Sequence, residues 1–151
     1  MRVTERGTAG VLQSLKALAG SAPLAVEAGL FEHGSKVEGD AKELVPVDKG
    51  NLRASGFTLT PSLQNVGPGA QPSGEARAMA IATPQEISAV VGFGGPSLEY
   101  ALIQHERTDF HHAVGQAKYL SQPAQQRAPE LPATIAKHVQ RAVERMRRGT
   151  A

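Results

Sequence analysis

The chain has no cysteine and no tryptophan, and aromatic residues make up 4% of its 151 residues. Without cysteine, neither a disulfide nor a thiolate metal site is possible, which fits a reducing compartment. The four phenylalanines and two tyrosines are scattered singly, whereas a base-stacking surface needs several aromatic side chains on one sheet or groove. These absences argue against a disulfide scaffold and against a module that reads nucleic-acid sequence.

Long hydrophobic runs are also missing. No apolar stretch reaches the ~18–20 residues of a membrane span, and the first ten residues, MRVTERGTAG, lack the apolar core of a secretion signal. We therefore expect a soluble chain, made in the cytoplasm, with no membrane partner. A length of 151 residues predicts a single domain over residues 1–151.

The apolar pattern predicts helices, then strands, then helices. Spacing near 3.6 predicts a short helix over residues 9–19, a break at the GSAP sequence, and a second helix from Ser21 to Val45 that Pro46 ends. Leu52–Thr60 is predicted as a strand or a turn leading into one, and residues 76–83 and 86–94 as an antiparallel hairpin. Residues 61–75 are rich in Pro, Gly, Ser and Gln, which predicts a mobile arm.

The expected fold class is therefore α+β: a small antiparallel β-sheet packed against a long N-terminal helix and a C-terminal helix, with an extended Pro/Gly-rich arm. GGPSLEYALIQHE, residues 94–106, is predicted as a Gly–Pro turn followed by a short helix or strand that carries Tyr100, Leu102 and Ile103. Residues 107–117 are predicted as a polar loop, and residues 132–148 as the final helix. Pro129 and Pro132 prevent that helix from starting earlier.

The final helix is basic, although the formal net charge of the whole chain is only +2. Its cations can complement the helix dipole on a solvated face, or they can contact DNA or an acidic partner. The candidate contact residues are Lys137, Arg141, Arg145, Arg147 and Arg148.

Candidate chemistry is sparse. His105, Glu106, Asp109, His111 and His112 are of types that bind zinc or iron, but no HExxH spacing places two imidazoles on one helical face. The GFGGP sequence at residues 92–96 is followed by no Lys–Ser/Thr pair, so it favours a turn over a phosphate loop. We predict no metal, no cofactor and no catalytic residue, with a metal-dependent hydrolase built on the His105–His112 loop as a weaker alternative.

The sequence VPVDKGNLRASGF, residues 45–57, predicts a structural corner. Pro46 ends a helix, Asp48 can accept backbone N–H bonds, Gly50 can take a positive φ, and Asn51 can cap the next element.

This corner also belongs to a longer pattern. AKELVPVDKGNLRASG is followed by VVGFGG, then EYALIQHE, then HHAVGQAKYLSQPAQQ before a charged helix. The order resembles a family of neck or tail-completion proteins of long-tailed, siphovirus-like bacteriophages, also called tail-component or minor capsid proteins, over about residues 12–143. The sequence departs from the family pattern in the Pro/Gly-rich stretch 61–75 and at Pro129 and Pro132.

The resemblance implies a non-enzymatic virion protein at the head–tail joint. Such proteins form a ring, here expected to be six-fold or twelve-fold, around the DNA channel. Its partners would be a head-completion or connector protein and a tail terminator or tail tube protein, with non-specific contact to packaged DNA. A DNA-binding module that uses the basic C-terminal helix is the alternative. The structural residues that carry over are Pro46, Asp48, Gly50, Asn51, Leu52, Arg53, Tyr100, Ala101, His105, Glu106, Gly115, Lys118, Tyr119 and Leu120.

Overall fold

The computed structural model describes residues 8–47, 50–81, 83, 86–95, 98–109, 111 and 113–149. The remaining positions, Asp48 and His112 among them, lie outside the described residues. The helices are α1 (Thr8–Leu44), α2 (Asn51–Ala54), α3 (Gly74–Met79), α4 (Leu98–Glu106), α5 (Ser121–Arg127), the 3-10 helix η2 (Ala128–Glu130) and α6 (Leu131–Gly149). The strands are β1 (Gly56–Leu59), β2 (Gln64–Val66) and β3 (Val90–Phe93).

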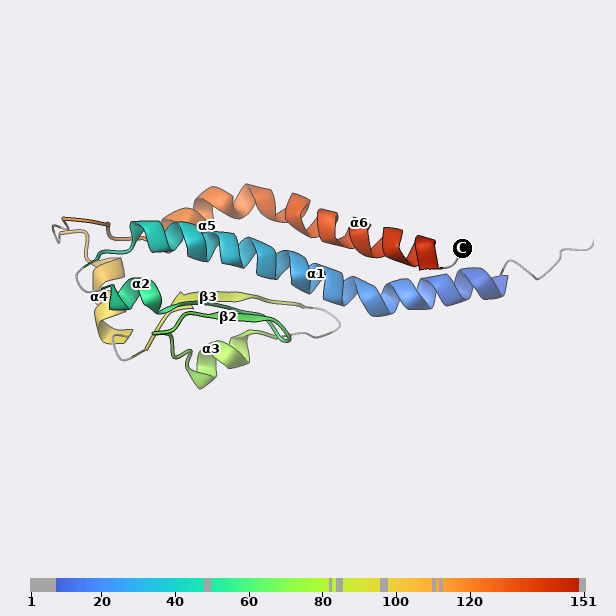
Figure 1. Ribbon diagram of the computed structural model, residues 1–151, viewed down its shortest axis with the longest axis horizontal. Coiled ribbons are helices and arrows are strands. Elements are labelled where there is room, and N and C mark those ends of the chain that lie inside the picture. Colours follow the sequence, from blue (N-terminus) through green and yellow to red (C-terminus); the bar gives the residue numbers. More distant parts are fainter. Residues whose placement is uncertain are drawn as a thin grey trace, which may run out of the picture.

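The elements form layers around α1, which is about 55 Å long at ~1.5 Å per residue. One side of α1 packs against α5 and α6, and the opposite side packs against the sheet (Figure 1). At the C-terminal end of α1 lie α2 and α4, and the N-terminal part of α1 runs past the end of α6 (Figure 1). This arrangement confirms the predicted α+β class. None of the helices in the described part of the chain is long and apolar enough to cross a membrane.

The predicted break in the first helix is wrong, because α1 continues through Pro23. A proline removes one intrahelical N–H and crowds the preceding turn. Here Pro23 is exposed, so the carbonyl that it leaves unbonded can face water. On the neighbouring turn, Ser21 donates a hydrogen bond to the Leu18 carbonyl at 3.3 Å and lies 3.6 Å from the Met146 sulfur on α6. The contact with α6 thus supports the helix where the sequence alone predicted an end.

Two glycines in α1 are positions of close packing. A Cβ added at Gly29 would lie 2.8 Å from Ile135 Cα on α6, and one added at Gly34 would lie 2.9 Å from Thr58 Cγ2 on β1. Each glycine lowers helix propensity by about 1 kcal/mol relative to alanine, but it allows α6 or the sheet to approach the axis of α1. These residues therefore set how closely the layers pack.

Within the described residues, the sheet is antiparallel and has the order β2-β1-β3. β1 pairs with β2 through Phe57↔Val66 and Leu59↔Gln64, and with β3 through Gly56↔Phe93 and Leu59↔Val90. The predicted strand over 76–83 is therefore wrong in its first part, but the tip of the predicted hairpin is present, because Ser88 N donates to Ile81 O at 2.9 Å and Thr83 N donates to Glu86 O at 2.7 Å. Residues 74–79 form a helix that the Ser73 hydroxyl caps by accepting a hydrogen bond from Ala76 N, and the partner of β3 is the distant β1.

The segment 61–75 is not the free arm that its composition predicted. It contains β2, and backbone hydrogen bonds tie the residues after β2 to the start of β1 and the end of β3: Gly67 N to Gly56 O at 2.9 Å, Gly69 N to Ala54 O at 3.2 Å and Gln71 N to Gly94 O at 2.9 Å. Its proline and glycine residues shape a compact turn that completes the sheet.

Candidate functional site

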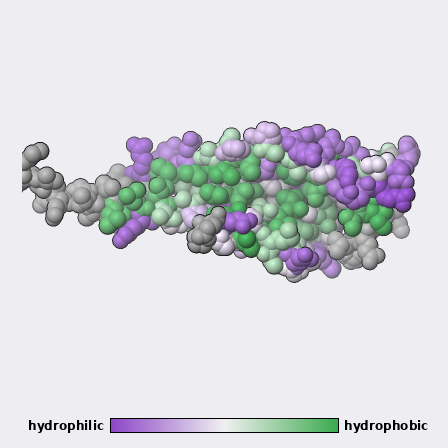
Figure 2. Space-filling model, turned by 180° about the vertical axis from the view of Figure 1, so that it is seen from behind, coloured by the Kyte–Doolittle hydropathy of each residue, from purple (hydrophilic) through white to green (hydrophobic). Residues whose placement is uncertain are grey.

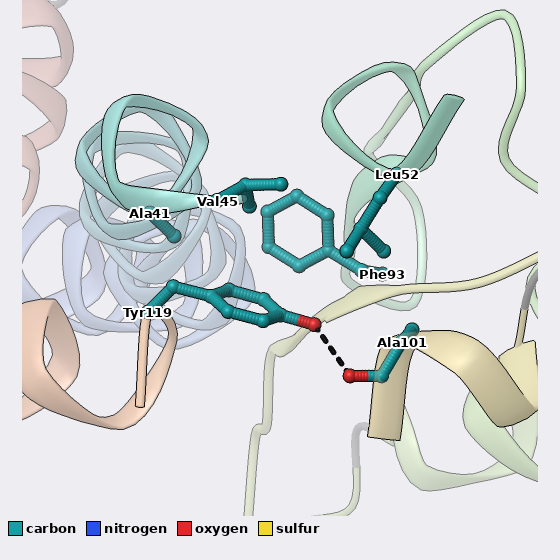
Figure 3. Packing of buried hydrophobic residues seen from close by; sticks show 6 residues of the cluster. All are labelled: Ala41, Val45, Leu52, Phe93, Ala101 and Tyr119. Carbon is teal, nitrogen blue, oxygen red and sulfur yellow. Dashed lines mark hydrogen bonds between the residues drawn. The ribbon is translucent and has the colours of Figure 1, made fainter. Parts of the chain in front are cut away.

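The residues that carried the family resemblance meet at the C-terminal end of α1. We call this region the junction; it comprises the end of α1 with residues 45–47, α2, α4 and residues 113–120. Its buried core consists of Ala41, Val45, Leu52, Phe93, Ala101 and Tyr119, and Figure 3 shows these side chains facing one another.

The backbones of Pro46 and Gly115 approach each other closely in the junction. A Cβ added at Gly115, whose φ is 88°, would lie 2.5 Å from Pro46 Cα. On either side of this contact, Gln116 N donates to Leu44 O at 2.8 Å and Val47 N donates to Val114 O at 3.3 Å. The chain after Pro46 is thus held against a segment that lies about seventy residues later in the sequence.

Gly50 adopts the positive φ predicted for it, at 76°. It occupies the N-cap position of α2, and Ala54 N donates to its carbonyl at 3.0 Å. Asn51, expected to act as a cap, is instead the first helical residue and is exposed, and α2 has no side-chain cap among the described residues. The predicted role of Asp48 falls outside the described residues.

Arg53 binds the end of α1. Its Nε donates to the Lys42 carbonyl at 2.6 Å, and its guanidinium lies 3.5 Å from the Glu43 carboxylate. The last carbonyls of a helix lack intrahelical partners, and a cation there also matches the negative pole of the helix dipole. Arg53 therefore terminates α1, with Leu52 beside it inserted into the core.

Tyr119 is the centre of the junction core. Its hydroxyl donates to the Ala101 carbonyl on α4 at 2.9 Å (Figure 3), and its ring meets those of Phe93 and His105 edge-on, at centroid distances of 5.3 and 5.0 Å. Burial raises the pKa of Tyr119 to about 12. The neighbouring Leu120 packs against the same core.

His105 is held by hydrogen bonds to both ring nitrogens. Ser121 N donates to Nε2 at 3.4 Å, which leaves Nδ1 to carry the hydrogen that it donates to Glu106 at 2.7 Å. Lys118, at φ 56°, donates its backbone N–H to the His105 carbonyl at 2.8 Å and forms an ion pair with Glu106 through its ammonium. The lysine lowers the pKa of the Glu106 carboxyl, and His105 lowers it further.

The histidine loop does not gather ligands in the region that the structure describes. Arg107 pairs with Asp109 at 2.6 Å, which lowers the pKa of that carboxyl to about 2, and His111 is exposed. No group of three or more His, Cys, Asp or Glu residues in the described ranges is placed to hold a metal ion. His112 lies outside these ranges.

The sequence analysis missed two glutamates that attach the sheet to α1. Glu38, 1% exposed, accepts the Thr58 hydroxyl at 2.6 Å and the Asn65 amide at 3.2 Å, and pairs with Lys42 at 2.6 Å. Glu27, 5% exposed, accepts from the Thr60 hydroxyl at 2.8 Å and from Ser62 N at 2.6 Å. Although burial raises the pKa of Glu27, hydrogen bonds from Ser62 and Thr60 outweigh it, so the net shift is downward.

A sequence signal for this attachment exists. Glu27 and Glu38 are three helical turns apart and lie among the apolar residues of α1, and Thr58 and Thr60 point to the same face of the β1 chain because side chains alternate along a strand. Two carboxylates facing two hydroxyls at these spacings indicate a polar contact between a helix and a strand.

Of the five candidate basic residues of α6, Arg147 is exposed, and the other four separate into two groups. Lys137 is bound to α1, since its ammonium lies 3.2 Å from Glu32, which also binds Lys36 at 2.8 Å and His138 at 2.7 Å. These contacts, that with Lys36 first, lower the pKa of the Glu32 carboxyl to about 2. In contrast, Arg141, Arg145 and Arg148 are exposed and line a shallow hollow together with Glu144.

Exposed apolar side chains form three groups. They are Tyr100, Leu102 and Ile103 on α4, Leu63 and Val66 beside and on β2, and Leu12 and Leu15 on the N-terminal part of α1. Other large apolar residues that are exposed outside these groups are Leu24, Val47, Met79 and Val114. On the face shown in Figure 2, hydrophobic surface forms a band along the long axis of the molecule, bordered on one side by hydrophilic surface.

Comparisons of the chain with protein-family models, with curated proteins and with solved structures give no match.

Proposed function

We propose that this chain is a structural protein of the head–tail joint of a long-tailed phage, where copies form a ring around the DNA channel. The observation that carries the proposal is the junction. The residues on which the resemblance rests lie between Pro46 and Leu120. Leu52 and Tyr119 are part of the buried core, and the Tyr119 hydroxyl donates to the Ala101 carbonyl. Arg53 binds the end of α1, and the backbone of Lys118 donates to the His105 carbonyl. Residues that specify one corner of a fold are what related structural proteins retain when their surfaces diverge.

The proposed role is not enzymatic. Several polar groups of the junction are engaged with one another: His105 with Glu106 and Ser121, Lys118 with Glu106, and Arg53 with the end of α1. The buried amide oxygen of Gln104 on α4 accepts no hydrogen bond within the described residues, but an amide oxygen neither gives nor takes a proton in acid–base catalysis. A catalytic acid, base or nucleophile needs a free lone pair or proton that faces a substrate. The junction offers a rigid corner instead, which suits a protein that positions its neighbours.

A ring needs two different complementary surfaces on each copy, because head-to-tail contacts are heterologous. The chain exposes apolar side chains on α4 at one end, on the N-terminal part of α1 at the other, and beside β2. We propose that two of these surfaces join copies into a six-fold or twelve-fold ring. The third would bind the connector on the head side or the terminator or tube on the tail side.

The proposal is tested by removing the gene from the phage that encodes it. Filled heads and complete tails that accumulate without joining, and that join when the purified protein is added, are the expected result. Electron microscopy of the joined particles should show a ring of this protein at the neck. Normal joined particles in the absence of the protein, or its presence in a different part of the virion, would contradict the proposal.

A further inference from the structure

Three arginines of α6 lie along one side of the helix. Arg141, Arg145 and Arg148 are separated by four and three residues, the spacing of neighbours on a helix surface. The line spans about 10 Å at ~1.5 Å per residue. We call these three residues the arginine stripe; Glu144 lies within it and lowers its local formal charge to +2, the sum of three arginines and one glutamate.

Several other cations of the described chain are engaged with carboxylates. Lys36 and Lys137 bind Glu32, Lys42 binds Glu38, Arg107 binds Asp109, Lys118 binds Glu106, and Arg127 binds Asp40 and Glu130. The arginines of the stripe have no such partner within the described residues. Lys137 shows the contrast directly, because it lies one turn before Arg141 on the same side of α6 and is bound to α1.

The helix dipole does not account for the whole stripe. Its effect is confined to the last turn, and α6 ends at Gly149. Arg148 lies in the last turn of α6, but Arg141 lies two turns before the end of the helix. The helix dipole therefore gives no account of Arg141.

The surroundings of the stripe favour a phosphate backbone over a protein. A protein interface has an apolar centre that is depleted in charge, whereas the exposed positions around the stripe are polar, including Gln140 and Glu144. A nucleic-acid interface is strongly positive and needs no such centre. The α6 sequence has no aromatic residue, so it offers nothing on which bases could stack. Guanidinium groups bind phosphate oxygens in pairs of parallel hydrogen bonds.

We infer that Arg141, Arg145 and Arg148 form a contact for the phosphate backbone of duplex DNA, and that Lys137 is not part of it. This inference deepens the proposed function and rests on it for its setting, a ring through which DNA passes. It also gives the ring an orientation. The stripe lies toward the end of α6 that is remote from the junction (Figure 1), so that end faces the channel and the junction faces away from it.

The test is fluorescence anisotropy of the full chain with a labelled duplex of about 30 base pairs, titrated from ~20 to ~150 mM NaCl. We expect binding without sequence preference that weakens as salt rises. The variant R141Q/R145Q/R148Q should bind at least about tenfold more weakly at the lowest salt, with a salt slope reduced by about one for each arginine removed.

Two controls make the result specific. The variant K36Q/R77Q/R107Q removes the same formal charge from other surfaces and should bind within about twofold of the parent. The variant K137Q should also bind like the parent, because Lys137 remains on Glu32. Equal weakening by both triple variants, absence of duplex binding at the lowest salt, or tighter binding of poly-glutamate than of duplex would each overturn the inference.

The result of this binding experiment can be distinguished from the result of the joining experiment that tests the proposed function. If the stripe variant joins heads to tails normally and the parent does not bind duplex, the inference fails and the structural role stands. If the parent binds duplex through the stripe but phage lacking the protein still joins normally, the structural role fails and the DNA contact stands.

Discussion

The hydroxyl of Thr58 on β1 donates a hydrogen bond of 2.6 Å to the carboxylate of Glu38 on α1, and both side chains are buried. The other carboxylate oxygen of Glu38 pairs with Lys42 at 2.6 Å. A buried carboxylate is strongly destabilising unless its oxygens are hydrogen-bonded. The sheet is therefore attached to α1 by a polar contact that requires Thr58 as well as by apolar packing.

Replacing Thr58 by valine should lower the free energy of unfolding by about 1–3 kcal/mol, because the shape is kept while a buried carboxylate oxygen loses the closer of its two donors. Chemical denaturation followed by circular dichroism measures this value. Thr108 is exposed in a loop, so Thr108→Val is the matched control and should leave stability within about 0.5 kcal/mol of the parent. Equal stability of Thr58→Val and the parent would show that Glu38 does not depend on this hydrogen bond.

Gly50 provides a test of the corner. A Cβ there would meet no atom within 4 Å, so the cost of a side chain comes from the φ of 76° alone. Gly50→Val should destabilise the protein by more than about 1 kcal/mol, the usual scale of backbone strain. A left-handed backbone costs about 1–2 kcal/mol for a typical residue that is not glycine, and a bulky branched residue costs more.

Gly39 is the matched control, because it also has free space around it but lies within the α-helix. Gly39→Ala should raise stability by about 0.5–1 kcal/mol. Thermal unfolding of both variants gives the comparison. An unchanged midpoint for Gly50→Val would mean that the corner relaxes to another backbone conformation.

The pH dependence of stability should report the Glu32 contacts between α1 and α6. The pKa of Glu32 falls from 4.5 to about 2, through Lys36 first and then His138 and Lys137. A carboxyl whose pKa is lower in the folded state stabilises the fold above its unfolded pKa, and this contribution is lost as the pH falls from about 4.5 toward 2. Since the side chain is partly exposed, solvent screening reduces the effect.

Glu32→Gln should therefore show a smaller decrease in melting temperature than the parent as the pH is lowered through this range. The two proteins should be compared at the same ionic strength, because added salt weakens the ion pairs. If their melting temperatures fall in parallel from pH ~4.5 to ~2, the Glu32 contacts do not contribute to the acid sensitivity of the fold.

The α+β class, the corner and the final helix could be predicted from the sequence because they depend on local rules. Proline ended the helix at Pro46, glycine took a positive φ at Gly50, and Pro132 lies at the second position of α6, where a proline is tolerated. These residues act through backbone geometry within a few positions of themselves, so the sequence contains the whole cause.

The errors in prediction arose where a distant partner decided the outcome. Pro23 predicted a break, but α1 continues through it, and the nearby Ser21 contacts Met146 on α6. Residues 76–83 alternated like a strand, but β3 found its partner in β1. Arg141, Arg145 and Arg148 could be distinguished from Lys137 only when Glu32 was seen beside Lys137. Periodicity and composition describe what a segment can do, and the tertiary partner selects among the options.

The segment 61–75 gives the last prediction, because its role changes once β2 is seen in the sheet. Asn65 binds Glu38 and Ser62 binds Glu27, so deleting residues 62–74 should remove one edge of the sheet and part of each polar attachment. We expect that deletion to prevent folding, which makes it useless as a test of assembly.

Leu63 and Val66 offer a sharper test, since their side chains are 38% and 37% exposed while their backbones stay in the sheet region. Leu63→Gln/Val66→Gln should keep the melting temperature within a few degrees of the parent, as expected for surface substitutions, and should block ring formation and head–tail joining.

Gln64→Ala is the control, because it changes the same edge strand without removing apolar surface. Mass photometry of rings and counts of joined particles measure the outcome. Normal rings and joined particles from the double variant would show that the surface beside β2 is not an assembly contact.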